Sequence, residues 1–434
     1  MKKTIEHKLD VAAHIIDICR QLQTAGYETY VVGGAVRDFL IDRIPKDYDI
    51  STAATPEDIR RVFGRRHARI IGRRFRLVHL HCAGEIIEIS TFRRKPSRED
   101  QDVKIRNKLG DVPDNMIFND NEFGSAREDA ERRDFTINAV FYDPVARMLV
   151  DYTGMGLDDI ADRVVRAIGN PEQRFQEDPV RVLRALKFAG QCDMTLAAET
   201  EAALVKSVPL IQLAAPSRLT LELEKILKNA SSHKIFRIFH HYGFLTHFLP
   251  RLNASWHEPE GMLAMQLLEI RNRRLAEGCY RDSISVAMSM LVLPYLEQRY
   301  GKAVDDESWF DARSREEFSD DIFAVMREFF APHTPIKALC FSAERTLRLL
   351  PELFRADKLH RALQHPGYPH AREMVAALNE LRWHYRDLEE RFPVPSPQTV
   401  ASGRHAAKSG RRRRRPRYQN KAPKTTATTG TPGQ

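Results

Sequence analysis

The sequence predicts an α+β protein in which a head of mixed helices and strands is followed by an almost wholly helical region. Strand-like apolar runs alternate with helical patterns up to about Asp151. From Ile160 to about Phe392 the pattern is helical, interrupted by glycine and proline breaks. From Pro393 onward the chain is rich in Pro, Ser, Thr, Gly and Arg without periodicity, which predicts a disordered tail.

The first elements of the head follow from apolar spacing and turn residues. Residues 9–25 repeat apolar side chains at i, i+3, i+4 and i+7, which predicts an amphipathic helix that ends at Gly26. Residues 27–32 predict a buried strand, and a helical pattern covers residues 35–41. Thr55 suits an N-cap and Pro56 the first helical position, so a further helix is expected to begin there.

The remainder of the head predicts three more strands and a loop. Residues 68–71, 75–82 and 85–92 are strand-like runs separated by glycine-containing turns. Residues 98–125 are polar, rich in Asn and Asp, and poorly periodic, which predicts a mobile loop.

Composition bounds the class of protein. A chain of 434 residues with 42% hydrophobic content can bury more than one core, so two or three structural units are expected. The five cysteines lie far apart and form no Cys-x-x-Cys pair, which indicates neither a disulfide framework nor a structural zinc site. The start of the chain has no apolar leader, and no stretch approaches 18 apolar residues. We expect a reducing, cytoplasmic location without a membrane span.

The basic charge is concentrated in the tail. The net charge is +9, and from Val394 to the end there are ten basic residues and no acidic one. The rest of the chain, with 58 basic and 59 acidic side chains, is about neutral. Such a tail attracts polyanions in a salt-dependent way, although a charge run is commonly just a solvated segment.

Asp47 and Asp49 are the most informative pair in the head. Two carboxylates one residue apart on a strand point to the same face, which suits hard divalent cations. A third ligand is offered by Glu88, because a charged residue within an apolar strand is costly unless it is paired or metal-bound. The alternative is that Glu88 pairs with a nearby arginine.

Gly33 and Gly34 follow the apolar run 27–32 and open a helical pattern. Glycines at such a point let backbone N–H groups approach a phosphate, and Arg37 and Lys46 add positive charge between the glycines and the aspartates. Metal-binding carboxylates beside a phosphate cradle predict phosphoryl or nucleotidyl transfer. That chemistry depends on positioning and electrostatics, so no Ser/His or Cys/His nucleophile is needed.

Three blocks carry a family resemblance. Gly33-Gly34-x-Val36-Arg37-Asp38 with Lys46-Asp47-x-Asp49 resembles the polymerase-β-like nucleotidyltransferases of the tRNA CCA-adding enzyme and bacterial poly(A) polymerase family, the class II group. Residues 128–139 and 177–184 resemble that family's ribose- and phosphate-contacting motif and its base-reading Glu-Asp-x-x-Arg motif. The resemblance implies a nucleotidyltransferase head with a mixed sheet, a helical neck and body, and RNA binding by the body.

The second and third blocks have their own chemistry. Arg133 can donate to phosphate, and Asp134 can accept from a ribose hydroxyl. The alternative for this block is a salt-bridged surface turn before the buried run 135–141. Asp178 and Arg181 offer an acceptor and a donor that match the Watson–Crick edge of adenine, while the alternative for Asp178 is a simple helix N-cap. Glu177, Arg181 and Arg184 are expected on one helix face, supporting each other.

The choice within the family depends on residues 70–80. Arg73, Arg74 and Arg76 match the pattern by which bacterial poly(A) polymerases differ from CCA-adding relatives, and the basic tail resembles theirs. The alternative is a hairpin whose cationic edge prevents aggregation. The predicted RNA-binding residues are Arg73, Arg74, Arg76, Arg411, Arg412, Arg413, Arg414 and Arg415.

The hypothesis is a template-independent poly(A) polymerase that adds AMP from ATP to RNA 3′ ends, with Mg²⁺ or Mn²⁺ as cofactor. A tRNA CCA-adding or A-adding enzyme and a catalytically inactive RNA-binding protein are the alternatives. We expect a monomer whose partners are RNA 3′ ends and ATP, with RNA-decay or RNA-chaperone proteins as further candidates. The expected units are residues 1–152 (head), 153–215 (neck), 216–392 (body) and 393–434 (tail).

Overall fold

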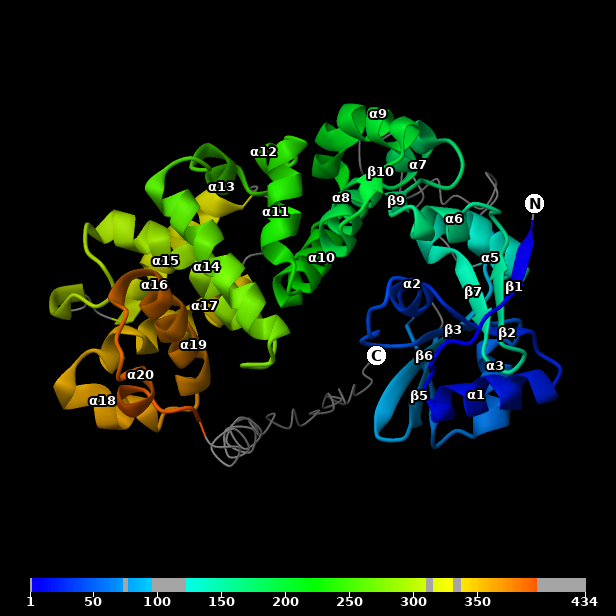
Figure 1. Cartoon of the computed structure of the whole chain (residues 1–434), viewed down its shortest axis with the longest axis horizontal. Coiled ribbons are helices and arrows are strands. Elements are labelled where there is room, and N and C mark those ends of the chain that lie inside the picture. The colour runs from blue at the N-terminus through cyan, green and yellow to red at the C-terminus, as the bar shows by residue number, and fades with distance from the viewer. Residues whose placement is uncertain (1, 73–76, 96–121, 310–314, 331–336, 396–434) are drawn as a thin grey trace, which may run out of the picture.

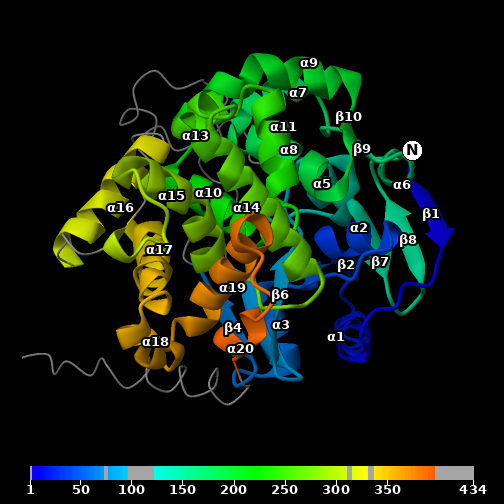
Figure 2. The same ribbon diagram turned by 60° about the vertical axis from the view of Figure 1, so that its left-hand side comes forward.

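The computed structural model describes residues 2–72, 77–95, 122–309, 315–330 and 337–395. It confirms the predicted fold class: a head built on a mixed sheet is followed by helices. In Figure 1 the sheet lies at one end of the molecule and helices α11–α20 at the other, with α7–α10 arching between them. The 60° turn in Figure 2 keeps β1 and β8 at the opposite end from α16 and α17.

The head contains an eight-stranded sheet in the order β1-β8-β7-β2-β3-β6-β5-β4 within the described residues. The pairs are antiparallel except for β3 and β6, which run parallel. The strands are β1 (Lys3–Glu6), β2 (Thr29–Val32), β3 (Asp49–Thr52), β4 (Ala68–Ile71), β5 (Leu77–Cys82), β6 (Glu85–Thr91), β7 (Val140–Asp143) and β8 (Met148–Asp151).

Helices cover the two faces of this sheet unequally. Ile15 of α1 (Ala13–Thr24) and Ile59 of α3 (Pro56–Phe63) share a buried cluster with Ile50 and Ile89 of the strands. On the other face, Ala126 and Ala130 of α5 (Ala126–Arg132) join a second cluster with Tyr30, Val32 and Phe141. Strand alternation puts Asp49 on this second face, because it pairs directly with Val32.

Local capping explains where two head helices begin. Thr55 caps α3 through a reciprocal pair of hydrogen bonds with Asp58, and Pro56 is its first residue, as predicted. Ser125 caps α5 in the same way with Glu128. Helix α2 (Gly34–Leu40) follows the glycine pair and precedes the loop that leads to Asp47.

The helical region contains two small exceptions to its prediction. Two-residue strands β9 (Val164–Val165) and β10 (Thr195–Leu196) pair in parallel. The helices are α6 (Gly156–Ala161), α7 (Pro171–Glu177), α8 (Val180–Cys192), α9 (Ala198–Ser207), α10 (Pro216–Lys228), α11 (Ser232–His241), α12 (Leu245–Phe248), α13 (Pro250–Ala254), α14 (Pro259–Ala276), α15 (Ile284–Tyr300), α16 (Arg315–Phe329), α17 (Lys337–Leu349), α18 (Ala356–Leu363), α19 (Tyr368–Leu378) and α20 (Leu388–Arg391), with short helical turns between them.

The structure corrects several element predictions. The first helix begins at Ala13 rather than at residue 9, and Asp47 lies in the loop before β3, so strand alternation does not place its side chain. Strands β1, β7 and β8 and helix α5 were not predicted, because each is only four to seven residues long and gives a weak local pattern. Most of the predicted 98–125 loop and the whole predicted tail beyond residue 395 lie outside the described residues.

Candidate active site

Asp49 and Glu88 stand side by side on the open part of the sheet. They are direct partners in the parallel pair of β3 and β6, so their side chains leave the same face of neighbouring strands. Both side chains are solvent-exposed. Partial desolvation, followed by the charges of Asp47 and Glu88, raises the pKa of Asp49 to about 6 against the opposing effect of Arg133. The three predicted carboxylates therefore act on one another electrostatically.

These carboxylates form no tight cluster in the structure. Within the described residues no group of three Asp, Glu, His or Cys side chains is close enough together to hold a metal ion. Glu88 contacts Nε2 of His79 on β5 through Oε1 at 3.4 Å, in place of the arginine considered as its alternative partner.

Gly33 lets the chain pass close to the carboxylates. Its φ of +74° favours glycine, and a methyl group there would stand 3.5 Å from Nη1 of Arg133 and 3.9 Å from Oδ2 of Asp49. Gly34 begins α2 on the same turn. Lys46 is exposed in the loop before Asp47. The glycine turn, Arg133 and Asp49 thus surround one space.

Arg37 is buried beneath this turn and does not extend into solvent beside it. Its side chain is 4% exposed, donates from Nη1 to Oδ1 of Asn138 at 2.8 Å and from Nη2 to Oδ1 of Asp38 at 2.6 Å. Its guanidinium also lies over the ring of Phe188. These contacts favour support of the turn over the predicted direct contact with phosphate.

Arg133 connects helix α5 to strand β3. Its guanidinium donates to Asp129 at 2.9 Å, to the Asn138 carbonyl at 3.2 Å and to Oγ of Ser51 at 3.3 Å. Ser51 follows Asp49 by two residues on the same face. The alternative interpretation of residues 128–139, a salt-bridged turn before residue 135, is therefore partly correct. The same turn also places Arg133 near the carboxylates.

Asp134 belongs to a buried ion-pair network that consists of Asp134, Arg184, Lys187 and Glu222. Arg184 donates from Nε to Asp134 at 2.6 Å and from Nη1 to Glu222 at 3.2 Å, and Lys187 donates to Glu222 at 2.5 Å. Burial opposes ionisation of both acids, yet the neighbouring cations keep the pKa of Asp134 well below its usual value and lower that of Glu222 to about 2. The network joins the head to α8 and α10.

The base-reading candidates occupy the junction of α7 and α8. Arg218 of α10 binds both oxygens of Asp178, at 2.8 and 2.7 Å, and Asp178 also accepts from the Val180 backbone. Arg181 donates to Glu177 at 3.3 Å, as predicted. Arg184 turns instead to Asp134 and Glu222, so the predicted mutual support of Glu177, Arg181 and Arg184 holds only for the first two.

Helix α10 supplies residues that sequence analysis missed. Arg218 contacts Asp178, Glu222 contacts Arg184, and Lys225 is close enough to lower the pKa of Asp49. These three positions share one face of the helix, at spacings of four and three residues. The charged stripe on this helix face was the one signal in the sequence that could have identified these residues. It was not sufficient, because the residues that they contact lie in other elements. Arg73, Arg74, Arg76 and the five tail arginines lie outside the described residues.

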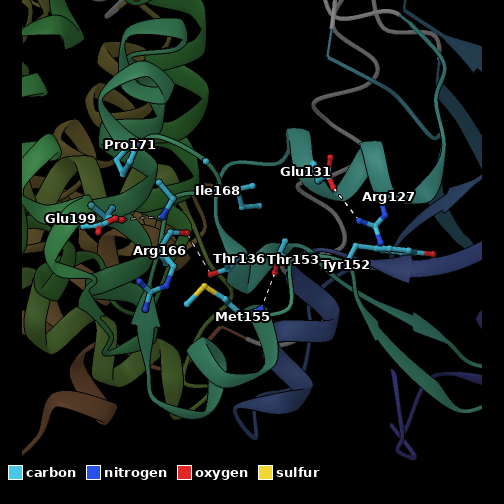
Figure 3. A pocket seen from close by; sticks show the side chains of 13 residues that line it. Arg127, Glu131, Thr136, Tyr152, Thr153, Met155, Arg166, Ile168, Pro171 and Glu199 are labelled. Carbon is cyan, nitrogen blue, oxygen red and sulfur yellow. Dashed lines mark hydrogen bonds and ion pairs between the residues drawn. The ribbon is translucent and has the colours of Figure 1, made fainter. Parts of the chain in front are cut away.

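A separate cavity of about 640 Å³ lies where α5, the β8–α6 turn, the β9–α7 segment and α9 meet (Figure 3). Arg127 and Glu131 on its wall approach each other to 3.8 Å, and Arg166 pairs with Asp159 at 3.0 Å. None of the predicted site residues lines it. Its arginines already have carboxylate partners, so the exposed carboxylates remain the better candidate for the chemistry.

Two segments of the chain match known protein families. Residues 29–166 match the family described as "Poly A polymerase head domain", and residues 193–255 match "Probable RNA and SrmB- binding site of polymerase A". Poly(A) polymerase I of Haemophilus influenzae is 37% identical over 259 residues, or 60% of this chain and 56% of that protein. The Salmonella typhimurium enzyme of the same name is 39% identical over 284 residues, or 65% and 59%. The chain thus matches less than two thirds of these relatives' length.

A CCA-adding enzyme and a solved structure extend the comparison. The CCA-adding enzyme of a Geobacillus species is 31% identical over 298 residues, which cover 67% of this chain and 68% of that protein. The Bacillus stearothermophilus CCA-adding enzyme in complex with CTP has the same fold, with a TM-score of 0.55, 22% identity and 91% of each chain covered. None of the helices in the described part of the chain has both the length and the apolar character of a membrane span. The chain belongs to the nucleotidyltransferase family that comprises the bacterial poly(A) polymerases and the CCA-adding enzymes.

Proposed function

We propose that this protein is a template-independent poly(A) polymerase that transfers AMP from ATP to RNA 3′ ends. The observation that carries the proposal is the placement of Asp49 and Glu88 on adjacent strands, with the Gly33 turn and Arg133 beside them. The identity to poly(A) polymerase I, 37–39% over the matched region, supports this choice over the alternatives. We also propose that the chain is divided into a head (1–152), a neck (153–215), a body (216–392) and a tail (393–434).

The carboxylates fit a divalent cation by the chemistry of their donors. Oxygen ligands suit Mg²⁺ and Mn²⁺, and the pKa of Asp49 is raised by desolvation and then by the neighbouring charges of Asp47 and Glu88. Asp47, Asp49 and Glu88 would hold the metal. When bound, it would supply Lewis-acid activation of the RNA 3′-hydroxyl and neutralise charge on the departing pyrophosphate.

The remaining roles belong to protein groups around this space. The backbone at Gly33 and Gly34 admits the triphosphate without a side chain in the way, and Arg133, Lys46 and Lys225 contribute positive charge. Arg37 positions the turn from below through Asn138. Asp134 is held by Arg184, so it would orient the sugar through a carboxylate that stays ionised.

Adenine selection is assigned to Asp178 and Arg181. Arg218 fixes the Asp178 carboxylate, and Glu177 contacts Arg181, so both groups would meet a base from supported positions. A carboxylate oxygen has two lone pairs, and Asp178 can therefore accept from an exocyclic amine while it remains paired. Supported acceptors and donors of this kind would choose the base without a nucleic-acid template.

The decisive experiment compares substrates. The protein is incubated with a generic RNA and ATP, and separately with tRNA lacking its 3′ end together with CTP and ATP. Long adenylate tails on the generic RNA are the expected result. CMP incorporation restricted to tRNA would establish the CCA-adding alternative, which the Geobacillus relative favours. RNA binding without transfer of either nucleotide would support the remaining alternative, a catalytically inactive RNA-binding protein.

The proposed setting is the cytoplasm, and all five cysteines are free, as a reducing compartment requires. We also propose that the protein acts as a monomer, and RNA-decay or RNA-chaperone proteins are its candidate partners. Size-exclusion chromatography with light scattering at several concentrations tests the monomer, for which a mass near 50 kDa is expected.

A further inference from the structure

Among the described residues, the sheet continues past the carboxylates as a partly exposed surface. On β5 and β6, Val78, Leu80, Ile87 and Ile89 are buried toward the α1 and α3 side. The residues between them point the other way. We define the outer face as the side chains Arg69, Ile71, Leu77, His79, His81, Ile86, Glu88 and Ser90, of which Arg69, Ile71, Ile86 and Glu88 are exposed and the others half-buried.

Strand register connects the outer face directly to the active-site carboxylates. Asp49 pairs with Glu88, Glu88 with His79, and His79 with Arg69, so four neighbouring strands carry one straight row. With strands about 4.8 Å apart, Arg69 stands roughly 14 Å from Asp49. Beside this row, Ile86 pairs with His81 and Ile71 with Leu77.

The chemistry of the outer face fits a nucleic acid strand. Glu88 is its one carboxylate, and the neighbouring Glu85 lies on the opposite side, 3.5 Å from His14 of α1. Arg69 offers charge to phosphate, while imidazole rings and the exposed Ile71 and Ile86 offer surfaces on which bases stack or pack. Ile86 is 55% exposed and Ile71 40%, so both offer apolar surface to a bound partner.

We propose that the outer face holds the last nucleotides of the RNA primer and leads its 3′ end to the carboxylates. The inference rests on the proposed function, because it assigns the primer to one side of the same site. Arg69, His81 and Ile86 then act as primer-positioning residues, with Arg69 on phosphate and His81 and Ile86 beneath bases. The alternative occupant of an exposed sheet face is a second copy of this chain, which would form a dimer there.

The first test measures RNA binding without catalysis. Fluorescence anisotropy of a labelled single-stranded 12-nucleotide RNA compares the full-length protein with the double variant Arg69→Ala/His81→Ala. We expect affinity to fall about tenfold and the salt dependence to weaken by about one counterion. The matched control is Arg20→Ala/His7→Ala, which removes the same residue types away from the outer face and should change affinity less than about twofold. Equal affinity of both double variants would overturn the proposal.

A charge pair at one exposed position guards against effects on folding. Ile86→Glu should weaken RNA binding and Ile86→Lys should strengthen it, because a nearby phosphate backbone repels a carboxylate and attracts an ammonium group. If both variants shift affinity in the same direction, the outer face does not hold RNA. Loss of a concentration-dependent dimer in sedimentation by both variants would assign the face to a second copy and overturn the proposal.

Kinetics separate this inference from the proposed function. In the adenylation assay, Arg69→Ala/His81→Ala should raise the KM for RNA about tenfold and leave the KM for ATP unchanged. Normal poly(A) synthesis with an unchanged RNA KM would overturn the outer face and leave the function intact. If the protein adenylates no RNA, the proposed function fails, and the anisotropy measurements still decide whether RNA lies on the outer face.

Discussion

The active-site carboxylates and the buried ion-pair network both contain acidic side chains. The two regions differ in how far neighbouring cations balance the acidic charge. The pKa of Asp49 is raised to about 6, first by desolvation and then by the like charges of Asp47 and Glu88, which Arg133 and Lys225 only partly offset. Glu222, between Arg184 and Lys187, has a pKa lowered to about 2 and is buried. A carboxylate whose charge is not balanced by neighbouring cations can bind a cationic ligand. A carboxylate that is paired with cations holds elements of the fold together. The difference agrees with the proposed assignment of chemistry to the first region and of a structural role to the second.

The largest expected effect is on catalysis, from Asp49→Asn. Removing one carboxylate from the metal-binding set should reduce AMP transfer by about 10³-fold or more. Thermal stability should stay the same or rise, because the change relieves repulsion among like charges. Asp17→Asn on α1 is the matched control and should be fully active. A variant that loses activity together with its fold would contradict the assignment of Asp49 to chemistry.

The opposite signature is expected from Glu222→Gln in the buried ion-pair network. Arg184 and Lys187 would lose their shared partner, and breaking a buried pair typically costs about 3 kcal/mol of stability. Urea unfolding measures this, with Glu224→Gln on the same helix as control. An unfolding free energy that equals the control's would mean that the network does not join head and helices.

The pH dependence of the same network has a definite sign. Because the folded pKa of Glu222 is about 2 and the ordinary value is 4.5, its stabilisation is fully present above about pH 4.5 and is lost as the pH falls toward 2. The melting temperature of Glu222→Gln should therefore depend less on pH across this window than that of the unmodified protein.

Local patterns were readable from sequence, and long-range contacts were not. The start of α3 at Thr55 and Pro56 follows from neighbours within three residues, so it could be predicted. The parallel partnership of Asp49 and Glu88 was within reach, because each lies in an apolar strand that fixes its face. The burial of Arg37 depends on Asn138, 101 residues away, and the pairing of Asp178 depends on Arg218. No local pattern records such partners.

Two glycines with similar positive φ angles give a further test of the site. Gly33 and Gly64 have φ of +74° and +81°, but an added methyl group would meet Arg133 and Asp49 at Gly33 and nothing within 4 Å at Gly64. Gly33→Ala and Gly64→Ala should both lose about 1 kcal/mol of stability from backbone strain. Only Gly33→Ala should also lose activity, by about 10²-fold, in the adenylation assay. Equal activity of the two variants would remove the Gly33 turn from the site.

The smallest effect concerns base choice, where the two regions meet on α10. Arg218 is half-exposed, so Arg218→Ala should cost less than about 1 kcal/mol of stability. It would release Asp178 from a fixed position, and the preference for ATP over CTP, measured as the ratio of kcat/KM values, should fall about tenfold. Lys206→Ala removes a comparable exposed ion pair, with Glu172, and should leave the ratio unchanged. If Arg218→Ala retains the full preference, Asp178 does not depend on α10 for its orientation, and Arg181, held by Glu177 and the Arg174 carbonyl, carries the selection of adenine.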